Sequence, residues 1–374
     1  MKFKLPDSLQ LEFLQARESY AIDIGYTSLK VAYLRGSFPN YSLYKWAILP
    51  LGGEFLSEVS PAERQAAVVS KLKEFFAREK VISKNIKTSV AGPMVVVRYV
   101  NLPKLKPEEL TKTIKFEAEQ YIPFNIEEVG ISFHLLNETV EDGQKKWQAI
   151  LVAAKKDLIQ SRLDIFNELG LRTVLVDIDD FALANAYNLV YGENPFGVDL
   201  LLNIGHQYTN IVIMEQGLPR VVRDIGVAGW EFTKAVQRAL SVDIIAAEKL
   251  KQKNGLLLSA EEKEQALREN NKEAIQTSSA LLTVAKIFLG EVRKSIDFYS
   301  SQSPDKSVER ILLSGGGARL KNLDRYIGNE LHLPTEVFNP LQNIAPEISV
   351  EDGQMLTIAT GLALRQEKDQ FRKQ

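Results

Sequence analysis

The chain has 374 residues, of which 45% are hydrophobic and 25% are charged, a composition typical of folded globular domains. The formal net charge of −2 offers no broad basic surface to a nucleic-acid backbone. The absence of cysteine excludes disulfides, thiolate nucleophiles and zinc–cysteine sites, and the three histidines, His134, His206 and His332, lack metal-ligand spacing.

The first predicted elements are short strands around a glycine. Residues 21–34, AIDIGYTSLKVAYL, read as a strand pair broken at Gly25, and another strand follows near 41–49. Residues 61–80 show the 3.6-residue periodicity of an amphipathic helix. The stretch 88–103, TSVAGPMVVVRYVNLP, is strand-like and ends at Pro103.

The next segment alternates helices and strands. Pro107 and two following glutamates favour a helix over 107–122, which Pro123 ends. Strands at 129–140 and 146–154 are joined by the turn residues Asp142-Gly143, and a helix at 157–169 leads to a strand at 172–178 and another helix. Residues 88–178 are therefore predicted to form a separate α+β unit.

The second half begins with another strand pair, LLNIGHQYTNIVIM at 201–214. A strand at 219–229 and a helix from 230 follow, and residues 251–278 read as charge-rich surface helices with a Ser259–Glu262 capping box. A helix at 281–300 precedes ERILLSGGGARLKNL, a strand, a glycine turn and a helix over 309–323.

The two strand pairs match each other at an offset of 180 residues, which aligns Asp23 with Asn203 and Gly25 with Gly205. Glycine allows the backbone to approach a ligand closely, and successive turn N–H groups bind anions. Two facing turns of this kind would hold a polyphosphate from both sides, with hydroxyl donors from Thr27, Ser28 and Thr209. Lys30 would add positive charge, and Asp23 would hold Mg²⁺ through water.

The glycines at 315–317 extend this scheme, because they follow an apolar strand and precede a helix N-terminus. A dinucleotide GxGxxG fingerprint is excluded, since its last glycine would fall on Leu320. The chain also lacks a GxxxxGK[ST] phosphate loop.

The order of strand pair, inserted unit, second strand pair and late glycine turn resembles the actin-like ATPase superfamily. KFEAEQYIPFNIEEV at 115–129, VDIDDFALANAY at 176–187 and GEVRKSIDFY at 290–299 closely resemble segments of its PilM family, which belongs to type IV pilus assembly. The resemblance implies an α/β fold of two duplicated ribonuclease-H-like halves with an inserted α+β subdomain of the FtsA/PilM type. The expected boundaries are 1–87 and 179–199 for the first half, 88–178 for the insertion, and 200–374 for the second half, with a helical subdomain at about 230–300.

The resemblance also implies ATP and Mg²⁺ as ligands. Tyr26 is bulkier than the residue usual in the first phosphate motif, Ala228 stands where a second glycine is common, and Glu291 with Lys294 fit an adenosine-contacting helix. The residues that carry over as nucleotide-binding are Asp23, Gly25, Tyr26, Thr27, Ser28, Lys30, Asn203, Gly205, Tyr208, Thr209, Gly229, Glu231, Glu291, Lys294, Gly315, Gly316, Gly317 and Ala318. Asn203 replaces an expected aspartate and cannot act as a general base, so we expect ATP binding with slow or no hydrolysis.

The implied function is that of an adaptor that binds the cytoplasmic N-terminal segment of the membrane protein PilN and links the machine's cytoplasmic and membrane parts. Candidates for the peptide groove are Arg98, Tyr121, Ile122, Pro123 and Phe124. Alternatives are an FtsA-like filament of cell division, a secretion-system relative and a small-molecule kinase. Residues 1–15 do not read as a secretory signal, RQEKDQFRKQ at 365–374 lacks a membrane-binding apolar face, and no apolar run approaches the ~20 residues of a membrane span, so we expect a cytoplasmic protein.

Overall fold

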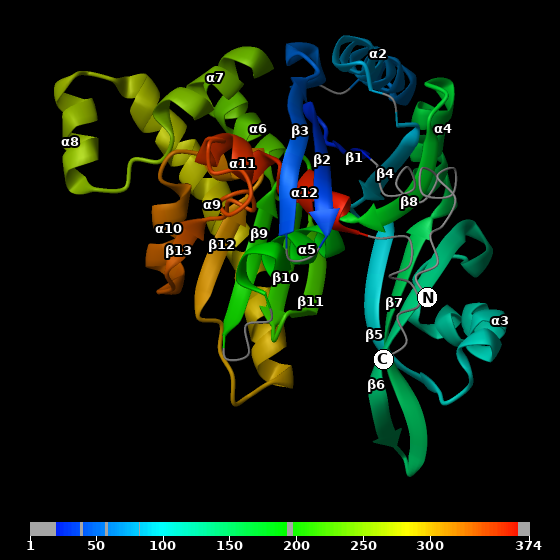
Figure 1. The fold of residues 1–374 in the computed structure, drawn as a ribbon. Coiled ribbons are helices and arrows are strands. Elements are labelled where there is room, and N and C mark those ends of the chain that lie inside the picture. The colour runs from blue at the N-terminus through cyan, green and yellow to red at the C-terminus, as the bar shows by residue number, and fades with distance from the viewer. Residues whose placement is uncertain (1–19, 38–39, 57–58, 82, 193–196, 366–374) are drawn as a thin grey trace.

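The computed structural model describes residues 20–37, 40–56, 59–81, 83–192 and 197–365 (Figure 1). The expectations for residues 1–15 and 366–374 lie outside these ranges. Among the described residues, no helix is both long and apolar enough to cross a membrane. The described residues form three sheets, two of five strands and one of three.

The first sheet has the strand order β3-β2-β1-β4-β8. Its strands are β1 (Tyr20–Ile24), β2 (Ser28–Ser37), β3 (Asn40–Pro50), β4 (Asn85–Val90) and β8 (Arg172–Ile178). β1 pairs antiparallel with β2 and parallel with β4, and every residue of β1 is buried, because helices cover both faces of the sheet. α2 (Pro61–Glu79) and α4 (Lys156–Glu168) share one core with β1 and β2.

The second sheet repeats this topology with the order β11-β10-β9-β12-β13. Its strands are β9 (Val198–Ile204), β10 (Thr209–Glu215), β11 (Leu218–Ile225), β12 (Arg310–Ser314) and β13 (Thr335–Val337). As in the first sheet, the first two pairings are antiparallel and the last two are parallel. The duplication inferred from two strand pairs therefore extends to all five strands of each half.

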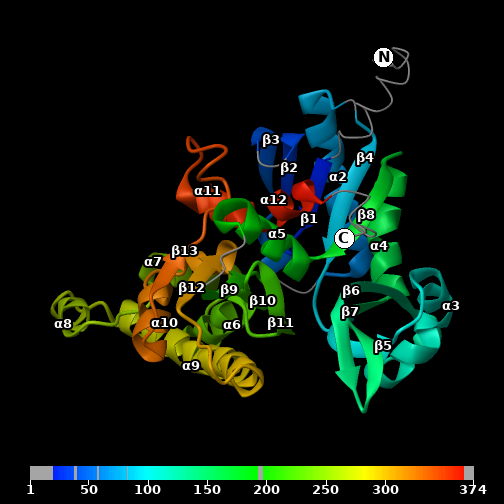
Figure 2. The same cartoon turned by 60° about the horizontal axis from the view of Figure 1, so that its bottom comes forward.

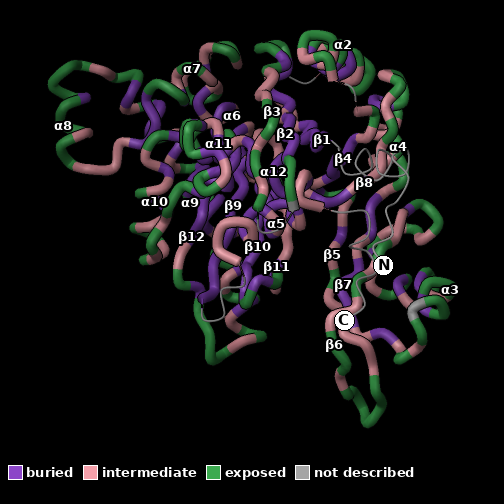
Figure 3. The backbone as a smooth tube through the Cα atoms, in the orientation of Figure 1, coloured by how far each residue is buried: buried purple, intermediate pink, exposed green. Residues whose placement is uncertain are grey.

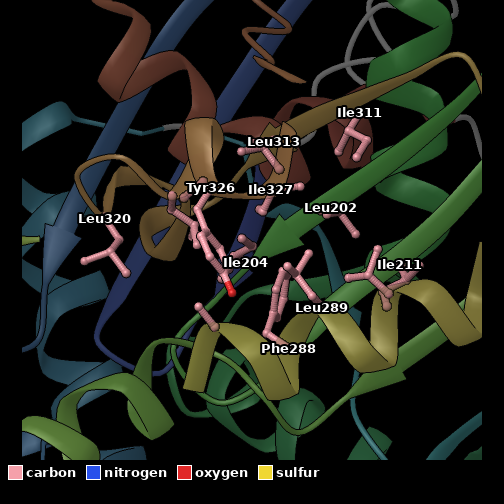
Figure 4. Close-up of a cluster of buried hydrophobic side chains, with 14 of the residues drawn as sticks. Leu202, Ile204, Ile211, Phe288, Leu289, Ile311, Leu313, Leu320, Tyr326 and Ile327 are labelled. Atoms are coloured by element: carbon pink, nitrogen blue, oxygen red, sulfur yellow. The ribbon is translucent and has the colours of Figure 1, made fainter. Parts of the chain in front are cut away.

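Helices cover the second sheet on its outer face. Figure 4 shows Phe288 and Leu289 of α9 (Lys272–Gln302) beside Leu202 and Ile211 of the sheet. α6 (Gly229–Leu240) and α10 (Leu323–Leu331) contribute to the same core. Beyond it lie α7 (Ile244–Asn254) and α8 (Ala260–Arg268), and α8 begins with the expected capping box, in which Ser259 and Glu262 cap each other. Figure 3 shows α8 largely exposed at one end of the molecule.

Two helices join the halves. α5 (Asp179–Tyr191) and α12 (Thr357–Leu364) pack in one core with Ala21 of the first sheet and Leu201 of the second. A Cβ atom on Gly361 would lie 1.7 Å from the carbonyl oxygen of Ala182, so only glycine permits this helix contact without a shift. The short α11 (Val350–Met355) precedes α12.

The third sheet has the order β5-β7-β6 and stands apart from the other two (Figure 2). Its strands are β5 (Val95–Pro103), β6 (Val129–Glu141) and β7 (Gln144–Lys155), and α3 (Pro107–Ala118) packs on it. The turn of β6 and β7 has positive φ at both Asp142 and Gly143, as the Asp-Gly pair predicts. We call β5, α3, β6 and β7 the inserted unit.

The single strand-like stretch expected at 88–103 is two strands in two different sheets. β4 ends at Val90 and β5 begins at Val95, and Gly92 between them has φ of +94°. Because β4 and β8 pair within the first sheet and α4 packs on it, the inserted unit is narrower than the expected range 88–178. Hydrophobic periodicity did not reveal this break, because the chain turns within four residues, and the local signal for the turn was the Gly92-Pro93 pair.

Candidate functional site

A cavity of about 740 Å³ lies between the two halves, within the range of small-molecule sites. The two turns of the matched strand pairs and the glycine turn after β12 meet at this cavity. Of the expected nucleotide-binding residues it is lined by Asp23, Gly25, Tyr26, Thr27, Ser28, Lys30, Asn203, Gly205, Tyr208, Gly229, Gly315, Gly316 and Gly317.

The first turn is held by two cations. Lys30 Nζ lies 3.3 Å from Asp23 Oδ2, across the strand register that pairs these two residues. Arg64 of α2 donates hydrogen bonds of 2.7 Å to the Gly25 carbonyl and 2.6 Å to the Tyr26 carbonyl. A Cβ on Gly25 would lie 2.5 Å from Lys30 Nζ, so the glycine makes room for the lysine to cross the turn. Burial lowers the pKa of Arg64 to about 10, which leaves it charged at neutral pH.

The second turn repeats the register pair with neutral groups. Asn203 and Asn210 occupy the positions of Asp23 and Lys30, and Asn203 Nδ2 donates to Asn210 Oδ1 at 2.7 Å. Thr209 is fully buried and donates to the Val227 carbonyl, so its hydroxyl ties β10 to the loop before α6 and does not line the cavity.

The two turns touch each other at matched positions. The rings of Tyr26 and His206 stack with their centroids 5.0 Å apart and an interplanar angle of 8°. His206 also lies against Trp230, and burial, with Lys251 nearby, lowers its pKa to about 4. His206 is therefore neutral at pH 7. The sequence offered no signal for this stack beyond the bulk of Tyr26.

The third turn approaches the second so closely that it requires glycine. A Cβ on Gly315, whose φ is +83°, would lie 2.5 Å from the Ile204 carbonyl oxygen, and one on Gly317 would lie 2.5 Å from Ile204 Cγ2. Ala318 points into the core and not into the cavity.

Carboxylates line the cavity beside α5. Burial and the neighbouring Asp23 raise the pKa of Asp179, in the first turn of α5, to about 7. Burial also raises the pKa of Asp180 and of Asp224, which lie behind the cavity wall and are not part of its lining. Arg162 of α4 lines the same wall, and its buried Nε has no hydrogen-bond partner among the described residues. An unpaired buried guanidinium N–H points to an anionic ligand.

The expected adenosine contacts lie elsewhere. Glu291 on α9 pairs with Arg223 of β11 and with Lys294, and neither Glu291 nor Lys294 lines the cavity. Sequence periodicity correctly placed Glu291 and Lys294 on one helix. However, the face of α9 that carries Glu291 lies toward β11 and not toward the cavity. The cavity instead receives Glu248 and Lys251, also three residues apart, from α7.

α6, the helix expected from residue 230, contributes to the cavity lining through its first residue. Gly229 lines the cavity, and a Cβ there would lie 3.1 Å from the Gly205 carbonyl oxygen. Glu231 is not part of the lining and forms an ion pair with Lys234.

The expected groove residues lie on the inserted unit, away from the cavity. Tyr121 and Phe124 are half-buried against its core, Pro123 and Arg98 are exposed, and Ile122 is only 7% exposed. Ile122 therefore supports the surface from within and cannot form much of it. The ring of Phe124 lies 5.0 Å from Lys155 Nζ.

The cavity residues that the sequence analysis missed include five ionisable ones, Arg64, Arg162, Asp179, His206 and Lys251. Four of them lie in helices or turns whose sequence patterns predict amphipathic packing or a turn but not a site. Asp179 carried a usable signal, because paired aspartates directly after a buried strand and at the start of a helix are uncommon as packing residues.

Comparison with known proteins adds a family match. The family model described as type IV pilus assembly protein PilM matches residues 21–367. A structure of a PilM–PilN type IV pilus biogenesis complex superposes with a TM-score of 0.75 and 26% identity, covering 93% of this chain and 98% of that chain.

More distant structures share the fold. MreB5 of Spiroplasma citri bound to ADP gives a TM-score of 0.52 at 14% identity, covering 93% of this chain and 95% of that one. The ethanolamine utilization protein EutJ from Carboxydothermus hydrogenoformans gives 0.51 at 13%, covering 93% and 89%. The expected actin-like fold is thus confirmed.

Proposed function

Because the chain belongs to the family of type IV pilus assembly proteins PilM, we propose that it is an ATP-binding adaptor that holds the N-terminal segment of PilN. It would sit beside the inner membrane through this partner and link the cytoplasmic and membrane parts of the machine. The observation that carries the nucleotide part is the cavity in which three glycine turns from both halves meet Arg162, whose buried Nε has no hydrogen-bond partner among the described residues.

The cavity has suitable chemistry for a nucleoside triphosphate. The close backbone approach that glycine permits at Gly25 and Gly205, with the cations Lys30 and Arg162, suits the phosphates. The Gly205 N–H itself donates to the Tyr208 carbonyl and closes the second turn. Glu248 and Lys251 on α7, where Lys251 donates to the Gly229 carbonyl, suit the sugar hydroxyls. Arg162→Gln should weaken ATP binding by about tenfold or more. Arg172→Gln, at the exposed start of β8, should leave it unchanged.

The residues also fit a magnesium ion held through water. Asp23, Asp179 and Asn203 present oxygen atoms to one cavity, and oxygen ligands are those that Mg²⁺ prefers. Within the described residues, no three His, Asp or Glu side chains converge as direct metal ligands. The ion would therefore depend on phosphate and water oxygens, and when bound it would neutralise phosphate charge.

We propose that hydrolysis is slow. Asn203 cannot accept a proton, and Asp23 is already paired with Lys30. Among the described residues of the lining, Glu248 is paired with Lys251, so Asp179 is the carboxylate whose replacement should abolish any residual turnover. Phosphate release of ~1 s⁻¹ or faster with Mg·ATP would contradict the proposal of slow hydrolysis.

The inserted unit supports the partner part of the proposal. The superposed structure is of a PilM–PilN complex, and its match covers 93% of this chain. A PilN N-terminal peptide should bind the purified protein, and Arg98→Ala and Tyr121→Ala should weaken it several-fold, since both side chains lie at the surface of the inserted unit. Arg268→Ala on the exposed α8 serves as the control. Absence of peptide binding, with and without Mg·ATP, would refute the adaptor function.

A further inference from the structure

Four polar residues form one row across the second sheet. Ser314, Asn203, Asn210 and Asp224 are successive register partners on β12, β9, β10 and β11. Asn203 and Asn210 are 8% and 2% exposed and line the cavity, so their amides are buried at the site itself. Strand register places all four side chains on one face of the sheet.

The hydrogen bonds along this row run in one direction. Ser314 Oγ donates to Asn203 Oδ1 at 3.3 Å, and Asn203 Nδ2 donates to Asn210 Oδ1 at 2.7 Å. Asn210 Nδ2 then donates to Asp224 Oδ1 at 2.6 Å. The other carboxylate oxygen accepts the backbone N–H of Gly92 at 2.6 Å. Gly92 lies in the loop that leads into the inserted unit, so both oxygens of Asp224 are held.

The Asp224 carboxylate determines the direction of the hydrogen bonds along the row. Both oxygens of Asp224 accept hydrogen bonds, so Asn210 must turn its NH₂ group toward Asp224 and its carbonyl toward Asn203. Asn203 must then donate to Asn210, which leaves its own carbonyl oxygen on the opposite side. There it lies 2.8 Å from the position of a Cβ on Gly315, at the third turn of the cavity.

We infer that Asp224 and Asn210 are positioning residues that hold Asn203 with its carbonyl oxygen, and not its NH₂ group, toward the cavity. A carbonyl oxygen accepts from the water of a divalent cation and repels phosphate oxygens. Asn203 therefore serves the Mg²⁺ of a bound nucleotide and not its phosphates. This inference rests on the proposed Mg·ATP binding.

The test measures the affinity for ATP once with Mg²⁺ present and once with EDTA, which removes it. We call the ratio of the first affinity to the second the magnesium gain. Asp224→Asn replaces one accepting oxygen by a donor, which allows the row to reverse and to turn the Asn203 NH₂ toward the cavity. We expect the magnesium gain to fall about tenfold while the affinity for metal-free ATP holds or rises. Asp297→Asn, the same change on the exposed surface of α9, is the control.

The double variant Asn210→Asp, Asp224→Asn distinguishes a change in the orientation of Asn203 from a general loss of structure. It shifts the carboxylate one strand along the row, so Asn203 again donates toward β10 and its carbonyl returns to the cavity. The magnesium gain should return to within about threefold of the wild-type value. If Asp224→Asn unfolds, Asn210→Ala interrupts the same row and leaves Asp224 bonded to Gly92.

An unchanged magnesium gain in Asp224→Asn, or a loss that the double variant does not restore, would overturn the inference. Failure of the proposed function has a different signature, since wild-type protein would then bind neither Mg·ATP nor metal-free ATP.

Discussion

At the residue scale, one matched pair of positions is joined by different interactions in the two halves. The register pair Asp23–Lys30 is an ion pair, whereas the matched pair Asn203–Asn210 is joined by an amide hydrogen bond. The second half already brings Asp224 to this row, and Asp179 lies at the same cavity. A further carboxylate at position 203 would be repelled by them, which gives a physical reason for asparagine there.

Asp179 gives a pH-dependent prediction. Its folded pKa of about 7 lies above the ordinary value of 3.8, so between these values the folded chain binds more protons than the unfolded one. Stability contributed by this group therefore falls as the pH rises through that window. Asp179→Asn should stabilise the ligand-free protein by on the order of 1–3 kcal/mol at pH 8 and by much less at pH 4.

Chemical denaturation at both pH values measures this difference. The exposed Asp157→Asn, at the start of α4, is the matched control and should show little change at either pH. An equal effect of Asp179→Asn at pH 4 and pH 8 would refute the argument.

At the element scale, α5 and α12 hold the halves together. Their contact depends on Gly361, and the core that they build includes residues of both large sheets. The glycine turns of the cavity are carried by the strands on either side, so their spacing depends on this helix pair. The apolar sequence of α12, TIATGLAL, predicts burial but does not indicate its neighbours.

Gly361→Ala should destabilise the protein by roughly 1–3 kcal/mol, because the new methyl group overlaps the Ala182 carbonyl and the helices must separate. Gly290→Ala in α9 is the matched control, since nothing lies within 4 Å of a Cβ there. It should be neutral or stabilise by about 1 kcal/mol through helix propensity. Thermal unfolding measures both, and equal effects of the two substitutions would contradict the packing argument.

At the scale of the whole molecule, the chain has three parts with one tryptophan each. Trp46 lies on β3 of the first half, Trp147 on β7 of the inserted unit and Trp230 on α6 of the second half. Among the described residues, those that line the cavity lie outside the inserted unit, and the Tyr26–His206 stack joins the two halves there.

Variants that keep a single tryptophan should therefore show which part of the chain each of the two proposed ligands stabilises. Mg·ATP at 100 times its dissociation constant should stabilise the halves by about 2.7 kcal/mol, shifting the Trp46 and Trp230 signals together and Trp147 less. A PilN peptide should shift Trp147 most. Denaturation curves followed by fluorescence check this, and an ATP shift confined to Trp147 would place the nucleotide on the inserted unit and overturn the proposed site.

Much of the fold was readable from the sequence. The 180-residue match of two glycine strand pairs predicted the duplication, because both pairs need the same backbone approach at Gly25 and Gly205. The capping box at Ser259 and the Asp142-Gly143 turn were predicted from local chemistry alone. The break between β4 and β5 was not predicted, although the Gly92-Pro93 pair marks a turn there, because a turn signal does not show that the flanking strands join different sheets.

The sequence by itself determined the duplicated elements, their glycine turns and the family, since these depend on local backbone requirements and on long matching segments. Only the tertiary structure decided which charged groups share the cavity, because Arg162, Lys251 and Asp179 arrive from three separate helices. It also decided the direction of the hydrogen-bonded row at Asn203. That direction depends on strand register between residues up to 111 positions apart in the chain, which no local pattern encodes.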